Sequence, residues 1–456
     1  MSALRLVNGR PEDQPATRRQ GVLGLPVVYD VHHPTLVAGP DVDSLRRHTS
    51  WYGPLPTTDR PVADLVAELD AVALAGRGGA HFAVARKWRS MAAREGGVVV
   101  ANGAEGEPAS AKDAALLQHR PHLVLDGLAC AAAAVGADRT VLWLHEGASA
   151  TRDAVTRAMT ERRSAGIRGP VVELATGPDS YLTGESSAVV RALSGGPALP
   201  AFRRVPATVS GIGGRPTLVH NVETLARVAL VARGGRTGYH DTTLVTVVAE
   251  GHRTVLEVDP STTVEQAVAA AVATASDGDP RTTVGRTGSA TAPQAVLLGG
   301  YGGTWLPWSQ AARLPLQHQA LKEAGAGLGA GIVVPLPADA CGLVETAGVL
   351  DYLAGSSARQ CGPCLFGVRA IADQLLELAQ GDGGRGNLRR LRRFAAEVEG
   401  RGGCHHPDGA VRLLLTAMTT FEADLSAHAR HGRCLHRDDP FAAPVVLPVP
   451  ALAGAR

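Results

Sequence analysis

Three cysteines near the end of the sequence are spaced as metal ligands. Cys361 and Cys364 form a C-x-x-C pair, and Cys404 lies between two segments with helical patterns. A C-x-x-C loop brings two thiolates to one centre, and a thiolate from a neighbouring turn adds a third ligand. The chain has 6 cysteines among 456 residues, which suits a metal or redox site better than a disulfide scaffold. We therefore predict that Cys361, Cys364 and Cys404 bind metal.

A glycine-rich segment, residues 76–88, could hold an anion. It reads G-R-G-G-A-H-F-A-V-A-R-K-W, and Gly76, Gly78 and Gly79 allow close approaches that a Cβ would block. Helical patterns flank it, so amide N–H groups at the start of the second helix could hold a phosphate or the polar edge of a flavin. Lys87 adds a positive charge. The G-K-[ST] of a Walker loop is absent, and an ordinary interhelical turn would have the same composition.

Polar residues follow an apolar segment at 98–101, which we predict to be a strand. Asn102, Glu105 and Glu107 come directly after it, and Lys112 and Asp113 follow. Open α/β sheets bind ligands at the carboxyl ends of their strands. The sequence therefore predicts a ligand site built from this end of the strand and the glycine-rich segment.

The two motifs, G-R-G-G-A-x-F with K-W and N-x-x-E-x-E-P-x-x-x-K-D, resemble the flavin-bearing, NADH-oxidising subunit of respiratory complex I (the 51-kDa or F subunit). They also resemble its relatives in hydrogenases and formate dehydrogenases, and the match recurs down nearly the whole chain after residue 50. The resemblance implies an α/β multidomain fold: an FMN-binding α/β domain, a ubiquitin-like β-grasp (SLBB-type) domain and a C-terminal helical bundle with a [4Fe–4S] cluster.

Further segments match the family's flavin site. Residues 176–187 contain a Y-x-x-G-E segment, which carries over Tyr181, Gly184 and Glu185, and residues 214–224 read G-R-P-T-L-V-H-N-V-E-T, which carries over Asn221 and Thr224. The family's second Glu, first Asn and flavin-contacting Asp are here Ser186, His220 and Ala104. The resemblance implies these cofactor-binding residues: Gly76, Arg77, Gly78, Gly79, Phe82, Lys87, Asn102, Glu105, Glu107, Tyr181, Gly184, Glu185, Asn221 and Thr224.

The expected NADH site is less complete than the expected flavin site. Family members place aromatic side chains around the adenine; Phe82 remains, whereas Ser90 and Val205 stand at the other two positions. Each lost aromatic pair removes about 0.5–1.5 kcal/mol beyond area burial. Glu107, which would reach the dinucleotide, is present. We predict that the chain keeps FMN and binds NADH weakly, or takes its electrons from another donor.

The family's cluster motif is C-x-x-C-x-x-C with a distant fourth cysteine, and Ala358 stands where its first cysteine would be. Alanine cannot ligate iron. The alternatives are a [4Fe–4S] cluster with an open iron or a non-cysteine ligand from His405 or His406, a [3Fe–4S] cluster, zinc bound by three cysteines and a histidine, or no metal. Cys130 is expected in the core, and Cys341 and Cys434 are not at family ligand positions.

Composition limits the partners. The net charge of +2 gives no electrostatic reason to expect nucleic acid or a membrane surface. No apolar run reaches the roughly 18 residues of a membrane span, so we expect a cytoplasmic chain without one. The resemblance implies an electron-acceptor protein, such as a ferredoxin-like or thioredoxin-fold redox subunit, as the partner. A cofactor-free structural relative is the remaining alternative.

Patterning along the chain predicts five regions. They are an extended segment (1–50), an α/β domain (51–235), a β-grasp domain (240–330), a helical bundle (345–430) and a flexible tail (431–456). In the α/β domain we expect strands at 98–101, 140–144 and 171–175 and helices at 116–135 and 150–163. In the next domain Thr262 and Glu265 are expected to form a capping box. Three apolar stripes, at 368–378, 388–398 and 411–425, predict the helices of the bundle.

Overall fold

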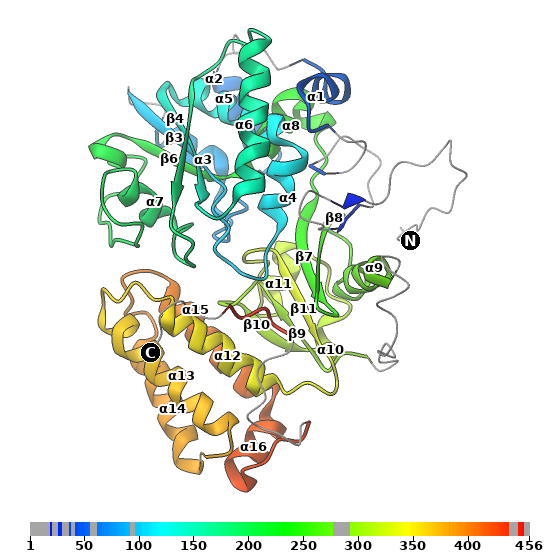
Figure 1. The fold of residues 1–456 in the computed structure, drawn as a ribbon, viewed down its shortest axis with the longest axis vertical. Coiled ribbons are helices and arrows are strands. Elements are labelled where there is room, and N and C mark those ends of the chain that lie inside the picture. The colour runs from blue at the N-terminus through cyan, green and yellow to red at the C-terminus, as the bar shows by residue number, and fades with distance from the viewer. Residues whose placement is uncertain are drawn as a thin grey trace. The chain divides into compact units, whose positions relative to one another are not determined.

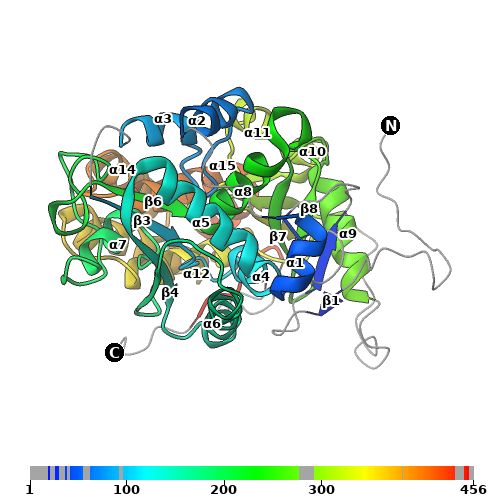
Figure 2. The same cartoon turned by 90° about the horizontal axis from the view of Figure 1, so that it is seen from above.

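The computed structural model describes residues 19–20, 26–29, 36–37, 42–54, 62–91, 96–276, 292–382, 384–436 and 446–450. The chain forms two compact units (Figures 1 and 2). The first comprises Met1–Gly106, Ala111–Leu244 and Val255–Asp259, and the second comprises Glu107–Ser110, Val245–Thr254 and Pro260–Arg456. Most of the segment 1–50 and most of the tail 431–456 lie outside the described residues.

A four-stranded parallel sheet forms the centre of the first unit. Its order is β5 (Val172–Gly177), β4 (Ala137–His145), β3 (Gly97–Asn102) and β6 (Thr217–Asn221). In the central register, Val100 lies opposite Val141 on β4 and Val219 on β6. The three predicted strands are confirmed as β3, β4 and β5, and β6 was not anticipated.

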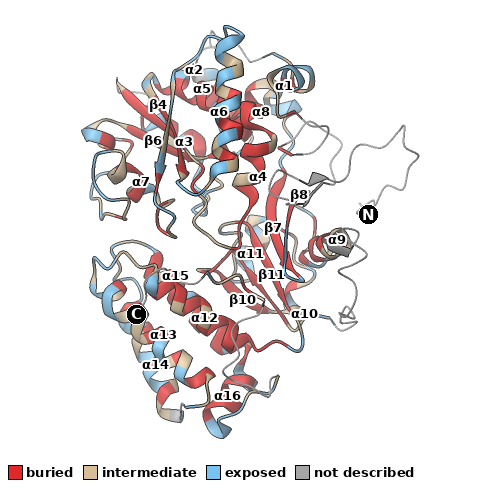
Figure 3. Cartoon of the chain, in the orientation of Figure 1, coloured by how far each residue is buried: buried red, intermediate tan, exposed pale blue. Residues whose placement is uncertain are grey.

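Both faces of this sheet are covered, because successive side chains point to opposite sides of a strand. Val99 and Leu142 pack with helices α5 (Pro121–Val135) and α8 (Val222–Gly238), which lie side by side in Figures 1 and 2. Val98 and Trp143 point the other way and pack with α7 (Ser186–Ala192). Figure 3 shows β3 buried almost throughout.

The prediction of one helix over 116–135 is wrong. The structure has two helices, α4 (Lys112–His119) and α5, separated at Arg120. Pro121 has no N–H to donate and is favoured in the first turn of a helix. Arg120 is buried, and its guanidinium donates to Tyr52 Oη and to the Val37 carbonyl, both at 3.1 Å. The predicted helix at 150–163 is confirmed as α6 (Ser149–Ser164).

Shorter elements complete the first unit. They are α1 (Leu45–Tyr52), α2 (Val62–Ala71), α3 (Val84–Arg89), β1 (Arg19–Gln20) and β2 (Pro26–Tyr29). Strand β2 runs parallel to the end of β8 (His252–Val258), with Val28 opposite Leu256. Helix α2 packs against α3 and α8 and leads into the glycine-rich segment.

The second unit contains a mixed sheet in the order β7 (Thr243–Ala249), β11 (Ile332–Leu336), β9 (Ala295–Leu298) and β10 (Thr304–Pro307). Strands β7 and β11 are parallel, and the other two pairs are antiparallel. Helix α9 (Val264–Ser276) contacts β11, and the short helix α10 (Trp308–Ala311) contacts β9 and β10. The short helix α11 (His318–Glu323) follows α10 in the chain.

The predicted capping box is displaced by one residue. Gln266 N donates to Thr263 Oγ1 at 3.3 Å, and Thr263 N donates to Gln266 Oε1 at 2.9 Å. Because α9 begins at Val264, Thr263 is the residue that can satisfy the first free N–H groups. Thr262 and Glu265 instead use their backbone in bonds to Leu316 and Ala312.

Helices make up the rest of the second unit. They are α12 (Gly342–Gly355), a π-helical turn (Pro363–Gly367), α13 (Val368–Ala379), α14 (Arg385–Val398), α15 (His406–Thr420) and α16 (Glu422–His431). The three predicted stripes are confirmed, but the last is divided between α15 and α16 at Phe421. Helix α12 was not anticipated. None of the helices in the described residues is long and apolar enough to span a membrane.

Candidate functional site

The glycine-rich segment forms a loop that is closed at its base. Gly76 N donates to the Phe82 carbonyl at 2.8 Å, and Val84 N donates to the Leu74 carbonyl at 2.9 Å. Gly79 has φ of +94° and His81 has φ of +49°, so the turn uses a conformation that favours glycine at its tip. These bonds fix the loop between α2 and α3.

The loop is anchored on the start of helix α8. Arg77 N donates to Thr224 Oγ1 at 2.9 Å, and a Cβ on Gly78 would lie 3.5 Å from Asn221 Cβ. The structure therefore brings Arg77, Gly78, Asn221 and Thr224 together, although the two motifs lie far apart in the sequence. Gly78 and Gly79 are exposed, and among the described residues their N–H groups have no acceptor. These two donors can bind an anion or the polar edge of a ring.

Two further predicted segments meet beside the end of β3. Asn102 Nδ2 donates to the Gly184 carbonyl at 2.8 Å. A Cβ on Gly184 would lie 2.2 Å from the Ala104 carbonyl oxygen, and one on Gly106 would lie 2.1 Å from the Tyr181 carbonyl oxygen. Both contacts are too close for any side chain, so glycine is required where the segments 102–106 and 181–184 touch.

Two of the acidic residues expected to bind the cofactor, Glu105 and Glu185, instead accept hydrogen bonds from helix N-termini. Glu185 caps α7: its Oε2 accepts from Ser187 N at 2.8 Å and Ala188 N at 3.0 Å. Glu105 accepts from Asp113 N and Ala114 N at the start of α4. Carboxylates at these positions are stabilised by the helix dipole. The two residues thus position the helices that border the site.

Lys87 and His220 lie where α3 meets β6. Lys87 Nζ donates to the Val219 carbonyl at 2.5 Å, and Trp88 Nε1 donates to His220 Nε2 at 2.8 Å. Burial lowers the pKa of Lys87 to about 8. Burial, with a smaller contribution from Lys87, also lowers the pKa of His220 well below its usual value. The imidazole is therefore neutral and serves as a buried acceptor for the Trp88 indole.

A continuous set of ionic contacts links these anchors, and much of it was missed by sequence reasoning. Lys112 Nζ lies 2.7 Å from Asp113 and 3.0 Å from Glu223. Arg227 pairs with Glu223 at 2.8 Å and with Asp241 at 3.0 Å. The set ends at the loop on one side and at β6 on the other, because Arg77 pairs with Asp241 at 2.7 Å and Asn221 Nδ2 donates to Asp113 at 2.5 Å.

Burial and pairing oppose each other in this network. Burial disfavours the charged form of Lys112, but Asp113 and Glu223 outweigh it and raise the pKa of Lys112. Burial likewise disfavours ionised Glu223, yet Lys112 and Arg227 lower the pKa of Glu223 to about 2. At Asp113 burial prevails over Lys112 and raises the pKa of the carboxyl. The network is thus charged at neutral pH and depends on its cations.

The three predicted metal ligands come together in the second unit. Cys361 precedes the π-helical turn, Cys364 lies inside it and is buried, and Cys404 lies just before α15. A hydrogen bond to Cys404 and burial, followed by the neighbouring Cys361, raise the pKa of Cys364. Metal binding would require these neighbouring thiols to release their protons and bind as thiolates. The residues present therefore fit an iron–sulfur cluster.

The two histidines named as possible fourth ligands differ. The His405 side chain is fully exposed. His406 is buried, and its Nε2 lies 2.9 Å from the Leu353 carbonyl oxygen. His406 is thus engaged with the backbone of α12.

The residues expected around NADH are divided between the two units. In the first unit, Phe82 and Val205 have exposed fractions of 47% and 45%, and Ser90 is also exposed. Arg86 lies over the Phe82 ring at 5.5 Å. In the second unit, Glu107 Oε2 accepts from Tyr301 N at 3.1 Å.

Sequence reasoning missed the acidic and basic residues Glu223, Arg227 and Asp241. A signal was available for the first two, because a Glu and an Arg four positions apart face each other on a helix. Asp241 offered no such signal, since it lies beyond the end of α8.

Two family models and several known proteins match the parts of the chain that contain these residues. The Nuo51 FMN-binding domain matches residues 69–230, and the NADH-ubiquinone oxidoreductase-F iron-sulfur binding region matches residues 345–428. An NADH-quinone oxidoreductase F subunit of Rhizobium meliloti (strain 1021) is 26% identical over 421 residues, which are 88% of this chain and 95% of that protein. The corresponding F subunit of Rickettsia bellii (strain OSU 85-389) is 24% identical over 387 residues, covering 81% of this chain and 91% of that protein.

A solved structure has the same fold. The crystal structure of an NAD+-reducing [NiFe]-hydrogenase in the air-oxidized state matches with a TM-score of 0.70 and 25% identity, over 88% of this chain and 69% of that chain. The glycine loop and its anchors fall inside the matched FMN-binding domain, and Cys361, Cys364 and Cys404 fall inside the matched iron-sulfur region. The chain therefore contains regions that match the Nuo51 FMN-binding domain and the oxidoreductase-F iron-sulfur binding region, and over most of its length it is similar to NADH-quinone oxidoreductase F subunits.

Proposed function

We propose that this chain oxidises NADH and passes the electrons through FMN and an iron–sulfur cluster to a partner redox protein. The observation that carries the proposal is the closed glycine loop, whose exposed Gly78 and Gly79 N–H groups lie beside the anchors Asn221 and Thr224. FMN, when bound, accepts two electrons and releases them singly. No side chain of the chain has to act as a nucleophile.

The chain's own residues hold and orient the flavin in this proposal. Gly78 and Gly79 donate their N–H groups to it. Lys87, whose pKa is lowered by burial to about 8, supplies a positive charge at neutral pH. The polar contacts that run from Arg77 to Asp113 hold the loop in a fixed position relative to the end of β6. Tyr181, Gly184 and Asn102 shape the opposite border. Within the first unit, Phe82 is proposed to contact the dinucleotide.

For the metal centre we propose an iron–sulfur cluster bound by Cys361, Cys364 and Cys404. A single tetrahedral zinc would need ligand atoms less than about 4 Å apart. Among the described residues, the ligating groups whose atoms all lie within 4.8 Å of one another are Cys341, His428 and Cys434, so at least one pair of sulfur atoms among Cys361, Cys364 and Cys404 is farther apart than that. Three ligands suit a [3Fe–4S] cluster or a [4Fe–4S] cluster with one iron open to solvent. His405, which is exposed and follows Cys404 directly in the sequence, is then a candidate for a further ligand.

A second candidate is a redox subunit with a donor other than NADH. The exposed Ser90 and Val205 favour it, since both offer little surface on which an adenine could stack. The two candidates share FMN and the cluster and differ only in the donor. Binding of NADH, NADPH and reduced ferredoxin therefore distinguishes them.

The experiment is anaerobic purification with flavin, iron, acid-labile sulfide and zinc measured together, followed by titration with each donor. We expect one flavin and an iron–sulfur signal in electron paramagnetic resonance of the reduced protein. NADH should bleach the flavin, with half-saturation well above micromolar concentrations. A colourless protein without flavin and iron would refute both candidates and leave the structural relative.

The Cys364→Ser variant separates the two centres. We expect it to lose iron and sulfide and to keep the full amount of flavin, because the flavin residues and the cysteines belong to different units. Cys130→Ser, a buried cysteine on α5, serves as the matched control. Equal loss of flavin and iron in Cys364→Ser would contradict the proposal of separate sites.

Three finer points belong to the same proposal. Residues 240–330 form a β-grasp domain of the SLBB type, the acceptor is a ferredoxin-like or thioredoxin-fold redox subunit, and the chain works in the cytoplasm. The order of β7, β8, α9 and β9, two strands followed by a helix and another strand, supports the first point.

A further inference from the structure

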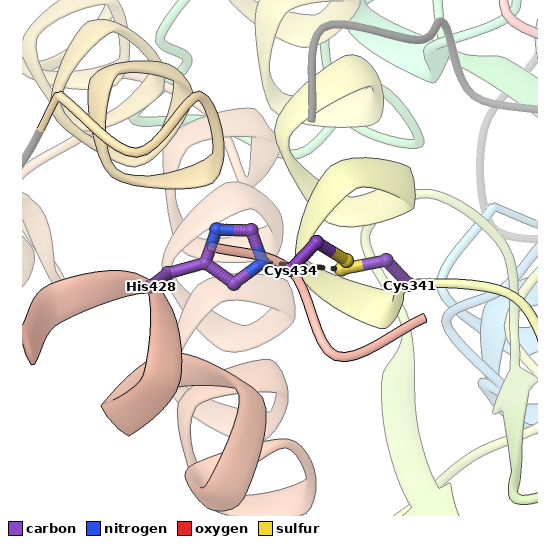
Figure 4. A group of neighbouring side chains, drawn as sticks. All are labelled: Cys341, His428 and Cys434. Atoms are coloured by element: carbon purple, nitrogen blue, oxygen red, sulfur yellow. Dashed lines mark hydrogen bonds between the residues drawn. The ribbon is translucent and has the colours of Figure 1, made fainter. Parts of the chain in front are cut away.

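A second group of ligating side chains lies in the second unit, apart from the three cluster cysteines. Cys341 is the residue before α12 and is fully buried, His428 lies on α16 and is fully buried, and Cys434 follows α16. Their sulfur and nitrogen atoms all lie within 4.8 Å of one another. Figure 4 shows the imidazole of His428 pointing toward the two sulfur atoms.

The spacing of these atoms matches that of a tetrahedral metal site. Zinc bonds of about 2.3 Å to sulfur and about 2.0–2.1 Å to nitrogen, at a tetrahedral angle, separate the two ligand atoms by about 3.6 Å. The distance from Cys341 Sγ to His428 Nε2 is 3.6 Å. Two thiolates and an imidazole form a borderline-soft donor set that suits zinc among the divalent ions.

A backbone N–H donor contacts the sulfur of Cys434. The backbone N–H of His436 donates to Cys434 Sγ at 3.4 Å. His436 is itself fixed, with Nε2 2.9 Å from Asp424 Oδ1 and Nδ1 3.0 Å from the Ala338 carbonyl oxygen. Hydrogen bonds that orient ligands and stabilise thiolates are a regular feature of metal sites.

We propose that Cys341, His428 and Cys434 bind one zinc ion, with a water molecule as the fourth ligand. Binding releases the two thiol protons and leaves two thiolates, a neutral imidazole and Zn²⁺, so no redox change occurs. The ion joins the start of α12 to α16 and to the chain that follows it. This site is independent of the flavin and of the iron–sulfur cluster, and its role is to fasten the C-terminal helix to the bundle.

Metal analysis of the whole protein tests the site. After aerobic and anaerobic purification, the wild-type chain should contain one zinc in addition to its iron. Cys434→Ser and His428→Gln should each lose that zinc and keep the iron, the acid-labile sulfide and the flavin. Cys130→Ser should keep all four. Unchanged zinc in Cys434→Ser, or an absence of zinc from the wild type, would overturn the proposal.

Two measurements on the wild-type chain do not depend on how the variants fold. Replacing zinc by Co²⁺ should give the visible absorption of tetrahedral cobalt and a thiolate charge-transfer band in the near ultraviolet. Mass spectrometry after alkylation without reduction should find Cys341 and Cys434 as separate thiols. A Cys341–Cys434 disulfide in the anaerobic protein would show that the two sulfurs bind each other instead of a metal.

Discussion

Replacing Lys112 by methionine tests whether the buried ionic network supports the flavin site. Lys112 and its two carboxylate partners are nearly inaccessible, with exposed side-chain fractions of 5% for Lys112, 7% for Asp113 and 2% for Glu223. Methionine fills much of the same volume and removes the charge. Glu223 keeps its contact with Arg227, whereas the charge of Asp113 is left with the Asn221 amide.

The expected cost follows from leaving a buried carboxylate without its cation. Removing one partner of a buried pair typically costs about 3–5 kcal/mol, whereas removing one partner of an exposed pair costs about 0–1 kcal/mol. Arg89→Met is the matched control, because Arg89 pairs with Asp70 at the same 2.7 Å with both side chains more than half exposed. We therefore expect Lys112→Met to lower the free energy of unfolding several times more than Arg89→Met.

The assay is urea denaturation of flavin-free protein, followed by tryptophan fluorescence. The deficit of Lys112→Met should also depend on pH. The loss of the cation raises the pKa of Asp113 further, so the folded state binds more protons than the unfolded state and its stability falls as pH rises above about 4. The deficit should thus be larger at pH 8 than at pH 5. The double variant Lys112→Met/Asp113→Asn should recover most of the stability, since no unpaired charge remains.

Equal stabilities of Lys112→Met and Arg89→Met would refute the reasoning. So would a double variant that is less stable than Lys112→Met, because the cost would then lie in the lost lysine and not in the stranded carboxylate. Flavin affinity gives an independent measurement. We expect it to fall in Lys112→Met and to return in the double variant.

Three more predictions concern the flavin and NADH sites. Gly184→Ala should prevent flavin loading, because the new Cβ would lie 2.2 Å from a backbone oxygen; Gly169→Ala, whose Cβ would meet nothing within 4 Å, should load normally in the same absorbance assay. Flavin affinity of the wild type, measured by fluorescence quenching, should fall as pH rises above 8. An anionic ligand favours protonated Lys87, and the pKa of Lys87 in the flavin-free protein is about 8. Lys87→Met should remove this pH dependence; a wild-type affinity that stays constant up to pH 10 would contradict it. Phe82→Leu should raise the KM for NADH by about tenfold or less, the equivalent of about 0.5–1.5 kcal/mol, with flavin content unchanged; an unaltered KM would exclude Phe82 from the NADH site.

Local patterns were sufficient for much of the fold. Val98 to Val100 form an apolar run followed by polar Asn102, and the run became the buried strand β3. Asn102 pairs with Asn221 of β6, which lies beside Gly78 of the glycine loop. The interruption at Pro121 was also present in the sequence, yet the long apolar pattern around it concealed the break. The proline at position 121 determined where one helix ends and the next begins, whereas the average apolar pattern indicated one continuous helix.

Long-range contacts were not predictable in the same way. Lys112 and Glu223 lie 111 positions apart, and Cys341 and His428 lie 87 positions apart. No periodicity in the sequence relates such residues, because only the packing of their helices and strands brings them together. The motif residues Gly78 and Asn221 could be assigned to one site only through a resemblance, and the structure supplies their contact.

The closed base of the glycine loop affects how the protein acquires its flavin. Hydrogen bonds from Gly76, Arg77 and Val84 hold the loop without help from any ligand. A receptor that is already shaped loses little conformational entropy when its guest arrives. Insertion of the prosthetic group can therefore follow folding of the polypeptide, and a chain that has lost its flavin can take up a new one without being unfolded first.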